Sequence, residues 1–233
     1  MRTGYILLLA ISTAPMLTGC PSDRYESAAG ELGKGDLAII CVPEDAVCKP
    51  GQEYLDAPTP VAMSASFEMN YSGPVPKSAT GEAFPAVLVS GSPPMLSKLD
   101  SVFTAWKPGT VAVLARTEQG TVLDFVHLRI AEIASIELTP TLDKLVVGEE
   151  QTITATATGP DALGSKPLAG SVPYSWKVEN SGGVDVTEGN PVLEIVKIHP
   201  RAITVIAREP GQSILRASAG NAVGEMTVIV EAP

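Results

Sequence analysis

The clearest pattern in the second half of the chain is an alternation of apolar and polar residues. In LVVGEEQTITATATG, Ile153, Ala155 and Ala157 fall on one face and threonines on the other. Such alternation is typical of a half-buried antiparallel strand. The runs YSWKVEN and AITVIA are also strand-like, and turn-forming residues separate the runs. We therefore expect a β-sandwich of roughly 100 residues with about seven short strands, one of which buries Trp176.

The sequence contains an internal repeat. AWKPGTVAVLAR (Ala105–Arg116) aligns with AREPGQSILRAS (Ala207–Ser218) at an offset of 102 residues, and each copy continues into another alternating run. After each Pro-Gly turn the inward positions are Val111, Val113 and Ala115 in the first copy, and Ser213, Leu215 and Ala217 in the second. A repeat of this length predicts two domains of one type, at residues 35–131 and 132–233. The joining sequence RIAEIASIEL has no Gly or Pro, so one domain should run almost directly into the next.

The second copy resembles the bacterial immunoglobulin-like group 2 family, the invasin/intimin type. The resemblance is carried by IELTP, by VG before a Thr-rich run, by YSW, by PGQSILRA and by the closing TVIV, within Ala134–Glu231. Members are commonly parts of surface proteins and adhesins, so the resemblance implies a binding or spacer module, not an enzyme. Ser181–Arg201 is longer and less regular than the family pattern. The first copy is divergent, and for it we expect only an immunoglobulin-like sandwich.

The N-terminus has the layout of a secretory signal peptide, residues 1–19. A positive charge, Arg2, precedes the apolar run Tyr5–Ile11, and small or turn-prone residues follow. The run is shorter than the roughly 20 residues that span a bilayer. Leu17–Cys20 resembles the lipobox of bacterial lipoproteins, which implies cleavage before Cys20 and a lipid anchor on it. The alternative is an ordinary signal peptide with an incidental cysteine. Pro21 after the cysteine implies outer-membrane placement, and polar residues 20–34 predict a flexible tether.

The composition is acidic and narrows the possible partners. The formal net charge is −10, and removal of residues 1–19 takes away Arg2, so 15 basic residues face 26 acidic ones and the charge becomes −11. This argues against nucleic acid or anionic lipid head groups as partners. In an exported chain the two remaining cysteines, Cys41 and Cys48, predict a disulfide. No Cys-x-x-Cys or neighbouring histidine indicates a metal or redox pair instead.

Few residues suggest chemistry. His127 should face solvent or a neighbouring domain, and His199 should lie in a loop; neither has a partner at metal-ligand spacing. The stretch GPDALGSK lacks the Gly-Lys-Ser/Thr order of a phosphate-binding loop. Trp106, beside the first Pro-Gly turn, is the candidate ligand-contact residue. We predict no catalytic residue, no metal and no cofactor.

The sequence therefore predicts an all-β lipoprotein with two tandem immunoglobulin-like sandwiches after a cleaved signal peptide and a tether. Its expected role is a non-catalytic binding, adhesion or scaffold module at the cell envelope, on either membrane face. The partners besides the membrane would be an envelope protein or a surface glycan. The alternatives are an accessory or weak hydrolase acting on cell-wall glycans, and a purely structural spacer.

Overall fold

The computed structural model describes residues 30–233 apart from residues 58, 143, 181 and 188. The signal peptide, Cys20 and most of the tether expected from the sequence lie outside the described residues. The first half contains β1 (Asp36–Ile40), β2 (Tyr54–Asp56), β3 (Val61–Ala62), β4 (Ser66–Ser72), β5 (Ala86–Ser90), β6 (Leu96–Leu99), β7 (Val102–Ala105), β8 (Gly109–Thr117) and β9 (Val122–Ala131). The second contains β10 (Ser135–Pro140), β11 (Leu145–Val146), β12 (Glu150–Thr158), η1 (Asp161–Leu163), β13 (Ser175–Asn180), β14 (Leu193–Ile198), β15 (Ala202–Ala207), β16 (Gly211–Ala219) and β17 (Ala222–Glu231).

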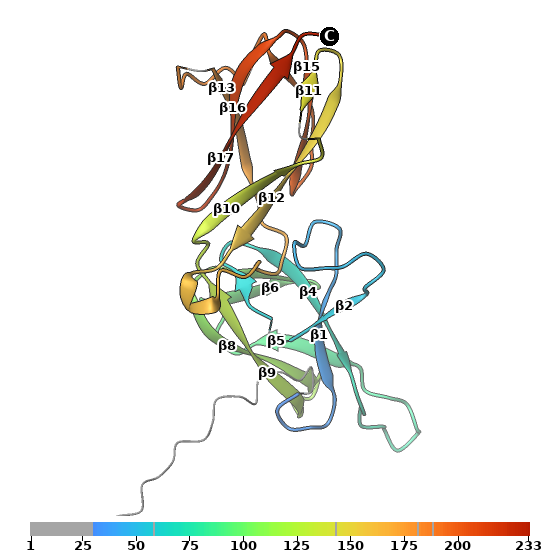
Figure 1. Cartoon of the computed structure of the whole chain (residues 1–233). Helices are drawn as coiled ribbons and strands as arrows, with labels where there is room; N and C mark the ends of the chain where they lie inside the picture. Colours follow the sequence, from blue (N-terminus) through green and yellow to red (C-terminus); the bar gives the residue numbers. More distant parts are fainter. Residues whose placement is uncertain (1–29, 58, 143, 181, 188) are drawn as a thin grey trace, which may run out of the picture.

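Each half is a sandwich of two sheets with the same strand order. The first half pairs β2-β1-β4-β7-β6 with β3-β9-β8-β5, and the second pairs β10-β12-β15-β14 with β11-β17-β16-β13. Apart from β2, every strand of one half has its counterpart in the other, including the short parallel pairs β3–β9 and β11–β17. In the lettering used for immunoglobulin domains, the sheets β1-β4-β7-β6 and β10-β12-β15-β14 have the order A-B-E-D. The sheets that face them have the order A′-G-F-C, so each half has the immunoglobulin arrangement. The chain is therefore two tandem immunoglobulin-like β-sandwiches, which Figure 1 shows end to end.

The repeated segments form equivalent strands, as the alternation predicts. Val111, Val113 and Ala115 of β8 are at most 2% exposed, and Ser213, Leu215 and Ala217 of β16 at most 1%. Trp176, the second residue of β13, is 7% exposed and packs beside Tyr174 with ring centroids 6.3 Å apart. Only residues 132–134 separate β9 from β10, so the short connection is confirmed. Burial of apolar side chains such as these stabilises each half.

The folded part begins before the expected end of the tether. Residues 30–34 were assigned to the tether from their polarity, yet the Glu31 amide donates to the Phe125 carbonyl of β9 at 2.8 Å. The reason is a long-range contact to Asp124, described below, for which a local polar pattern carries no signal. Within the described part of the chain, no helix is long and apolar enough to cross a membrane.

Candidate functional site

The disulfide predicted for the first domain is present and lies where the two sandwiches meet. Cys41 and Cys48 are bonded, with their Cα atoms 5.6 Å apart, and they close a loop between β1 and β2. A shallow groove of about 580 Å³ runs along this loop, and its lining includes Arg201 from the second sandwich. The loop is therefore part of the junction as well as of the first sandwich.

Asp45 in the disulfide loop connects the two sandwiches. It is 2% exposed, and its carboxylate accepts hydrogen bonds from the amide of Val47 at 2.9 Å and from the amide of Gly170 at 2.7 Å. Gly170 lies 125 residues further along the chain. A hydrogen bond to an ionised acceptor is worth about 1.5–3 kcal/mol, roughly twice a neutral one. Asp45 therefore stabilises the junction, and both its oxygens are engaged.

Arg201 holds the same loop from the other side. Its Nη1 donates to the main-chain oxygen of Asp45 at 3.2 Å, while Nε donates to the carbonyl of Ala155 at 3.1 Å and Nη2 to Oγ1 of Thr156 at 3.3 Å. Ala155 and Thr156 belong to β12. Because the guanidinium is planar and its donors have fixed directions, it positions the loop against this strand.

A segment of the second half also pairs with the first sandwich. Its main chain forms a parallel bridge between Ala169 and Val61 and an antiparallel bridge between Ser171 and Ser66. The Ser66 and Ser171 amides donate to each other's carbonyls at 3.0 and 2.8 Å. A Cβ added to Gly170 would lie 2.8 Å from the Ala65 Cβ, so only glycine fits this approach. At this point the main chains of the two halves pair directly, and the small residues Ala65 and Gly170 allow that close approach.

Trp106 is exposed on a different part of the first sandwich. It is 56% exposed, and its indole N–H donates to Oγ of Ser97 on β6 at 2.7 Å. Leu99 of β6 is 78% exposed and Val102 of β7 is 37% exposed. Ser97 and Leu99 share one face of the strand because they are two residues apart. We call Ser97, Leu99, Val102 and Trp106 the Trp106 face; that it contacts a ligand stays a prediction.

The N-terminal segment is clamped by a buried carboxylate that sequence reasoning missed. Asp124 of β9 is fully buried, and its oxygens accept four backbone amides at 2.7–3.0 Å, from Leu32, Lys34, Gly35 and Phe125. Burial of the carboxyl raises its pKa, but the four N–H donors outweigh that effect and hold the pKa below the usual value. An acidic residue inside an otherwise alternating strand, LDFVHL, was the available signal.

The two histidines make unrelated contacts. His127 lies on β9, and its Nδ1 lies 2.6 Å from Oε1 of Glu31, which also accepts the His127 amide at 3.0 Å. It therefore faces the N-terminal segment. His199 lies in the loop after β14 and lines two open grooves near the junction. Among the described residues, no group of three His, Cys, Asp or Glu side chains is placed to hold a metal ion.

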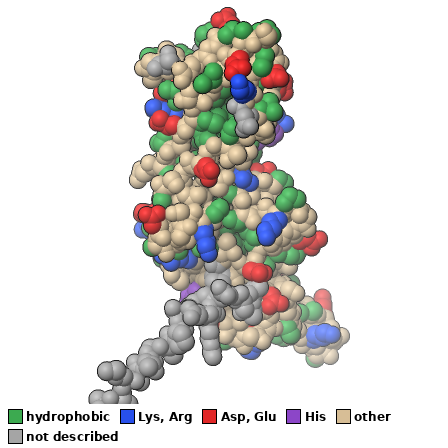
Figure 2. Space-filling model, viewed as in Figure 1, with side chains coloured by type: hydrophobic (Ala, Val, Ile, Leu, Met, Phe, Trp, Pro, Cys, Tyr) green, Lys and Arg blue, Asp and Glu red, His purple; other side chains and the backbone are tan. Residues whose placement is uncertain are grey.

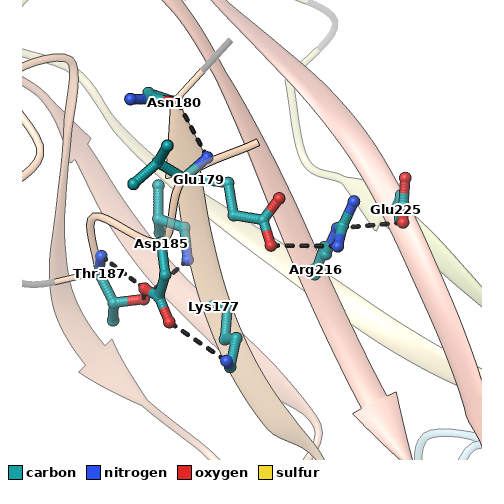
Figure 3. A network of polar contacts seen from close by, with 9 residues as sticks. Lys177, Glu179, Asn180, Asp185, Thr187, Arg216 and Glu225 are labelled. Carbon is teal, nitrogen blue, oxygen red and sulfur yellow. Dashed lines mark hydrogen bonds and ion pairs between the residues drawn. The ribbon is translucent and has the colours of Figure 1, made fainter. Parts of the chain in front are cut away.

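A network of charged side chains covers the outer face of β13 and β16 (Figure 3). Arg216 of β16 pairs with Glu179 at 3.1 Å and with Glu225 at 3.0 Å, and Lys177 pairs with Asp185 at 3.2 Å. Hydrogen bonds from Thr187 are the main cause that lowers the pKa of Asp185 to about 2, and Lys177 adds to it. Such pairs fold the loop after β13 back onto the strand. Figure 2 shows charged side chains scattered over the face in view.

Comparisons with known proteins find no matching family model and no matching curated protein. Solved structures that match include the Yersinia pseudotuberculosis adhesin InvE, with 14% identity over 87% of this chain and a TM-score of 0.32. Domains 4 and 5 of the S-layer protein SbsC match with 10% identity over 84% of this chain and 98% of that chain, TM-score 0.30. Titin Ig tandem domains A164-A165 match with 13% identity over 75% of this chain and 92% of that chain, TM-score 0.31. The chain spans 62% of the InvE chain.

Proposed function

We propose that this chain is an exported, lipid-anchored envelope protein whose two sandwiches form one stiff, non-catalytic binding or scaffold module. The observation that carries the proposal is the junction, where Asp45, Arg201 and the Ala169–Ser171 segment join the two halves in addition to the covalent link. A module whose domains are fixed in this way can hold a contact surface at a set distance and direction. The group 2 immunoglobulin-like classification of the second half belongs to the same proposal.

The proposed anchor is a lipid on Cys20. The tetrad Leu17–Cys20 supports it, and Pro21 supports outer-membrane placement. Two acyl chains anchor a protein stably where one does not. The described residues begin at Gly30, ten residues after Cys20, and a fully extended stretch of that length would reach at most about 35 Å. The first sandwich would therefore stay close to the membrane.

The anchor is tested by the intact mass of the protein from its native membrane. We expect a chain that starts at Cys20 and carries acyl mass, with two further thiols that react only after reduction. Replacement of Cys20 by Ser should abolish the acyl mass and release the protein from the membrane fraction. A mass without lipid, or with residues 1–19 retained, would contradict the anchor.

The proposed contact surface is the Trp106 face, and the proposed partner is an envelope protein or a surface glycan. Aromatic side chains contribute strongly to binding when a partner covers them. Trp106→Ala should leave the melting temperature nearly unchanged and should lower partner recovery from cross-linked membranes about tenfold or more, as is common for such residues. Ile229→Ala on β17 is a matched control, since that side chain is 59% exposed and lies outside the face. Equal recovery by both variants would count against the Trp106 face.

The rival reading, a hydrolase acting on cell-wall glycans, needs two carboxylates held about 5–10 Å apart across a cleft. The groove along the disulfide loop has one lining carboxylate, Asp45, and its oxygens are occupied by amides. This observation favours the binding module. Release of soluble products from peptidoglycan fragments by the purified protein would reverse the preference.

A further inference from the structure

Strand β14 is an edge strand with apolar side chains exposed along it. It ends the sheet order β10-β12-β15-β14, and in the described part of the chain no strand pairs with its outer side. Val196 is 49% exposed and Ile198 is 59% exposed. Another edge strand of the second sandwich, β13, is covered by the loop that follows it. The Asn180 amide donates to the Val184 carbonyl, and the Val186 amide donates to the Val178 carbonyl. An open edge with exposed apolar residues can accept another strand.

A bulge in β14 changes which side chains share a face. Its register against β15 shifts between Ile195 and Lys197, which leaves Val196 as the extra residue. Glu194 lies opposite Ile206 and Lys197 opposite Thr204. Because residues 204 and 206 are two apart, they share the outer face, and so do Glu194 and Lys197. Leu193 and Ile195 lie opposite the buried Ala207 and Val205, on the inner face. Ile198 lies opposite the buried Ile203 and so has the same register, although it is 59% exposed at the end of the strand.

This arrangement makes the sequence of β14, LEIVKI, complementary to a second copy of itself. If two β14 strands paired antiparallel about a twofold axis between residues 195 and 196, Glu194 of one copy would lie opposite Lys197 of the other, and Leu193 opposite Ile198. Directly opposed residues in a sheet must point to the same face. In a regular strand, residues three apart point to opposite faces, so this register would fail. The bulge removes that conflict for the Glu194–Lys197 and Leu193–Ile198 pairs, which match in face and in charge or apolarity. The central pair would be Ile195 opposite Val196, both apolar.

We propose that two copies of this chain associate through β14 and join their two four-stranded sheets into one of eight strands. A twofold interface requires a surface patch that is complementary to itself. Binding to an unrelated partner would not require this self-complementarity. The two Glu194–Lys197 pairs would fix the register, and the second copy would cover the exposed Val196. Glu194 already contacts Arg208 at 2.6 Å, so its carboxylate would accept from both cations.

The interface would be small. One strand pair buries less than the roughly 1,200–2,000 Å² typical of stable complexes, so we expect a dissociation constant in the range of about 10 µM to 1 mM. Such affinity is strengthened when molecules share a surface, because the local concentration rises. The dimer itself does not depend on the proposed anchor.

The test is sedimentation velocity of the purified protein from about 5 µM to about 1 mM, a range that spans the expected dissociation constant. The unmodified protein should move from monomer towards dimer. Lys197→Glu should remain monomeric, since it places like charges opposite each other, and the double variant Glu194→Lys with Lys197→Glu should dimerise again. Lys166→Glu makes the same charge change at an exposed site away from β14 and should behave as the unmodified protein does.

Several outcomes would overturn the proposal. They are a monomer at every concentration, a dimer of Lys197→Glu as strong as that of the unmodified protein, and a double variant that stays monomeric while its melting temperature is unchanged. Photo-crosslinking from position 196 in intact cells should give an adduct with twice the mass of the chain. An adduct of any other mass would assign the edge to a different protein.

Discussion

At the scale of single residues, Asp124 offers the sharpest test of the fold. Its carboxylate is fully buried and accepts four amides, three of them from the N-terminal segment. In Asp124→Asn one oxygen becomes an NH₂ group that faces amide donors instead of accepting from them. We expect a loss of about 2–3 kcal/mol in the free energy of unfolding, measured by denaturant titration, because charged hydrogen bonds are removed and buried donors are left without acceptors.

The same carboxylate gives a pH dependence with a defined sign. Its pKa in the folded state is lowered, so its contribution is fully present above the unfolded value of about 3.9 and is lost as the pH falls through the folded value. The amides of Leu32 and Lys34 should therefore lose protection from hydrogen exchange in acid, below about pH 4. In Asp124→Asn these amides should exchange quickly at every pH. Protection that does not change between pH 7 and pH 2 would contradict this assignment.

At the scale of elements, the sequence predicts well those strands that alternate regularly. β8 and β16 follow the two Pro-Gly turns and bury the predicted positions, because a half-buried strand imposes a period of two residues. β9 and β17 are the alternating runs expected after them. β14 is less regular, since its bulge shifts the period and exposes Val196. The expected irregularity of Ser181–Arg201 is thus explained in part by a bulge, which has no simple residue signature.

The contacts between elements were harder to predict than the elements. The disulfide follows from two cysteines in an exported chain, but its loop also joins the second sandwich through Asp45 and Gly170. Nothing local in the sequence near either residue indicates the other, because the pairing depends on how two separate folds meet. Trp176 was correctly placed in the core, since a large aromatic side chain within a sandwich strand has a general packing role.

At the scale of the whole molecule, the two sandwiches are joined by a short link and by direct contact. Residues 132–134 connect β9 to β10, and the Ala169–Ser171 segment lies against the first sandwich as a main-chain partner of Val61 and Ser66. Figure 1 shows the chain around η1 beside the lower sandwich. One covalent connection alone still permits bending and twisting, so in the proposed stiff module the contact of this segment with the first sandwich would set the relative direction.

Gly170 is the position at which this stiffness can be tested. Its φ is +97°, and a Cβ there would lie 2.8 Å from the Ala65 Cβ. Gly170→Ala should therefore separate the segment from the first sandwich and cost about 2–3 kcal/mol, from backbone strain together with overpacking. Gly148→Ala is a matched control, since Gly148 has a φ of +91° but no atom within 4 Å of the added Cβ, and it should cost only the strain, about 1 kcal/mol. Small-angle scattering should show a wider distribution of overall dimensions for Gly170→Ala and the unmodified profile for Gly148→Ala. If both variants scatter as the unmodified protein does, close packing at Gly170 does not set the relative direction of the sandwiches, and the stiff-module proposal loses its main support.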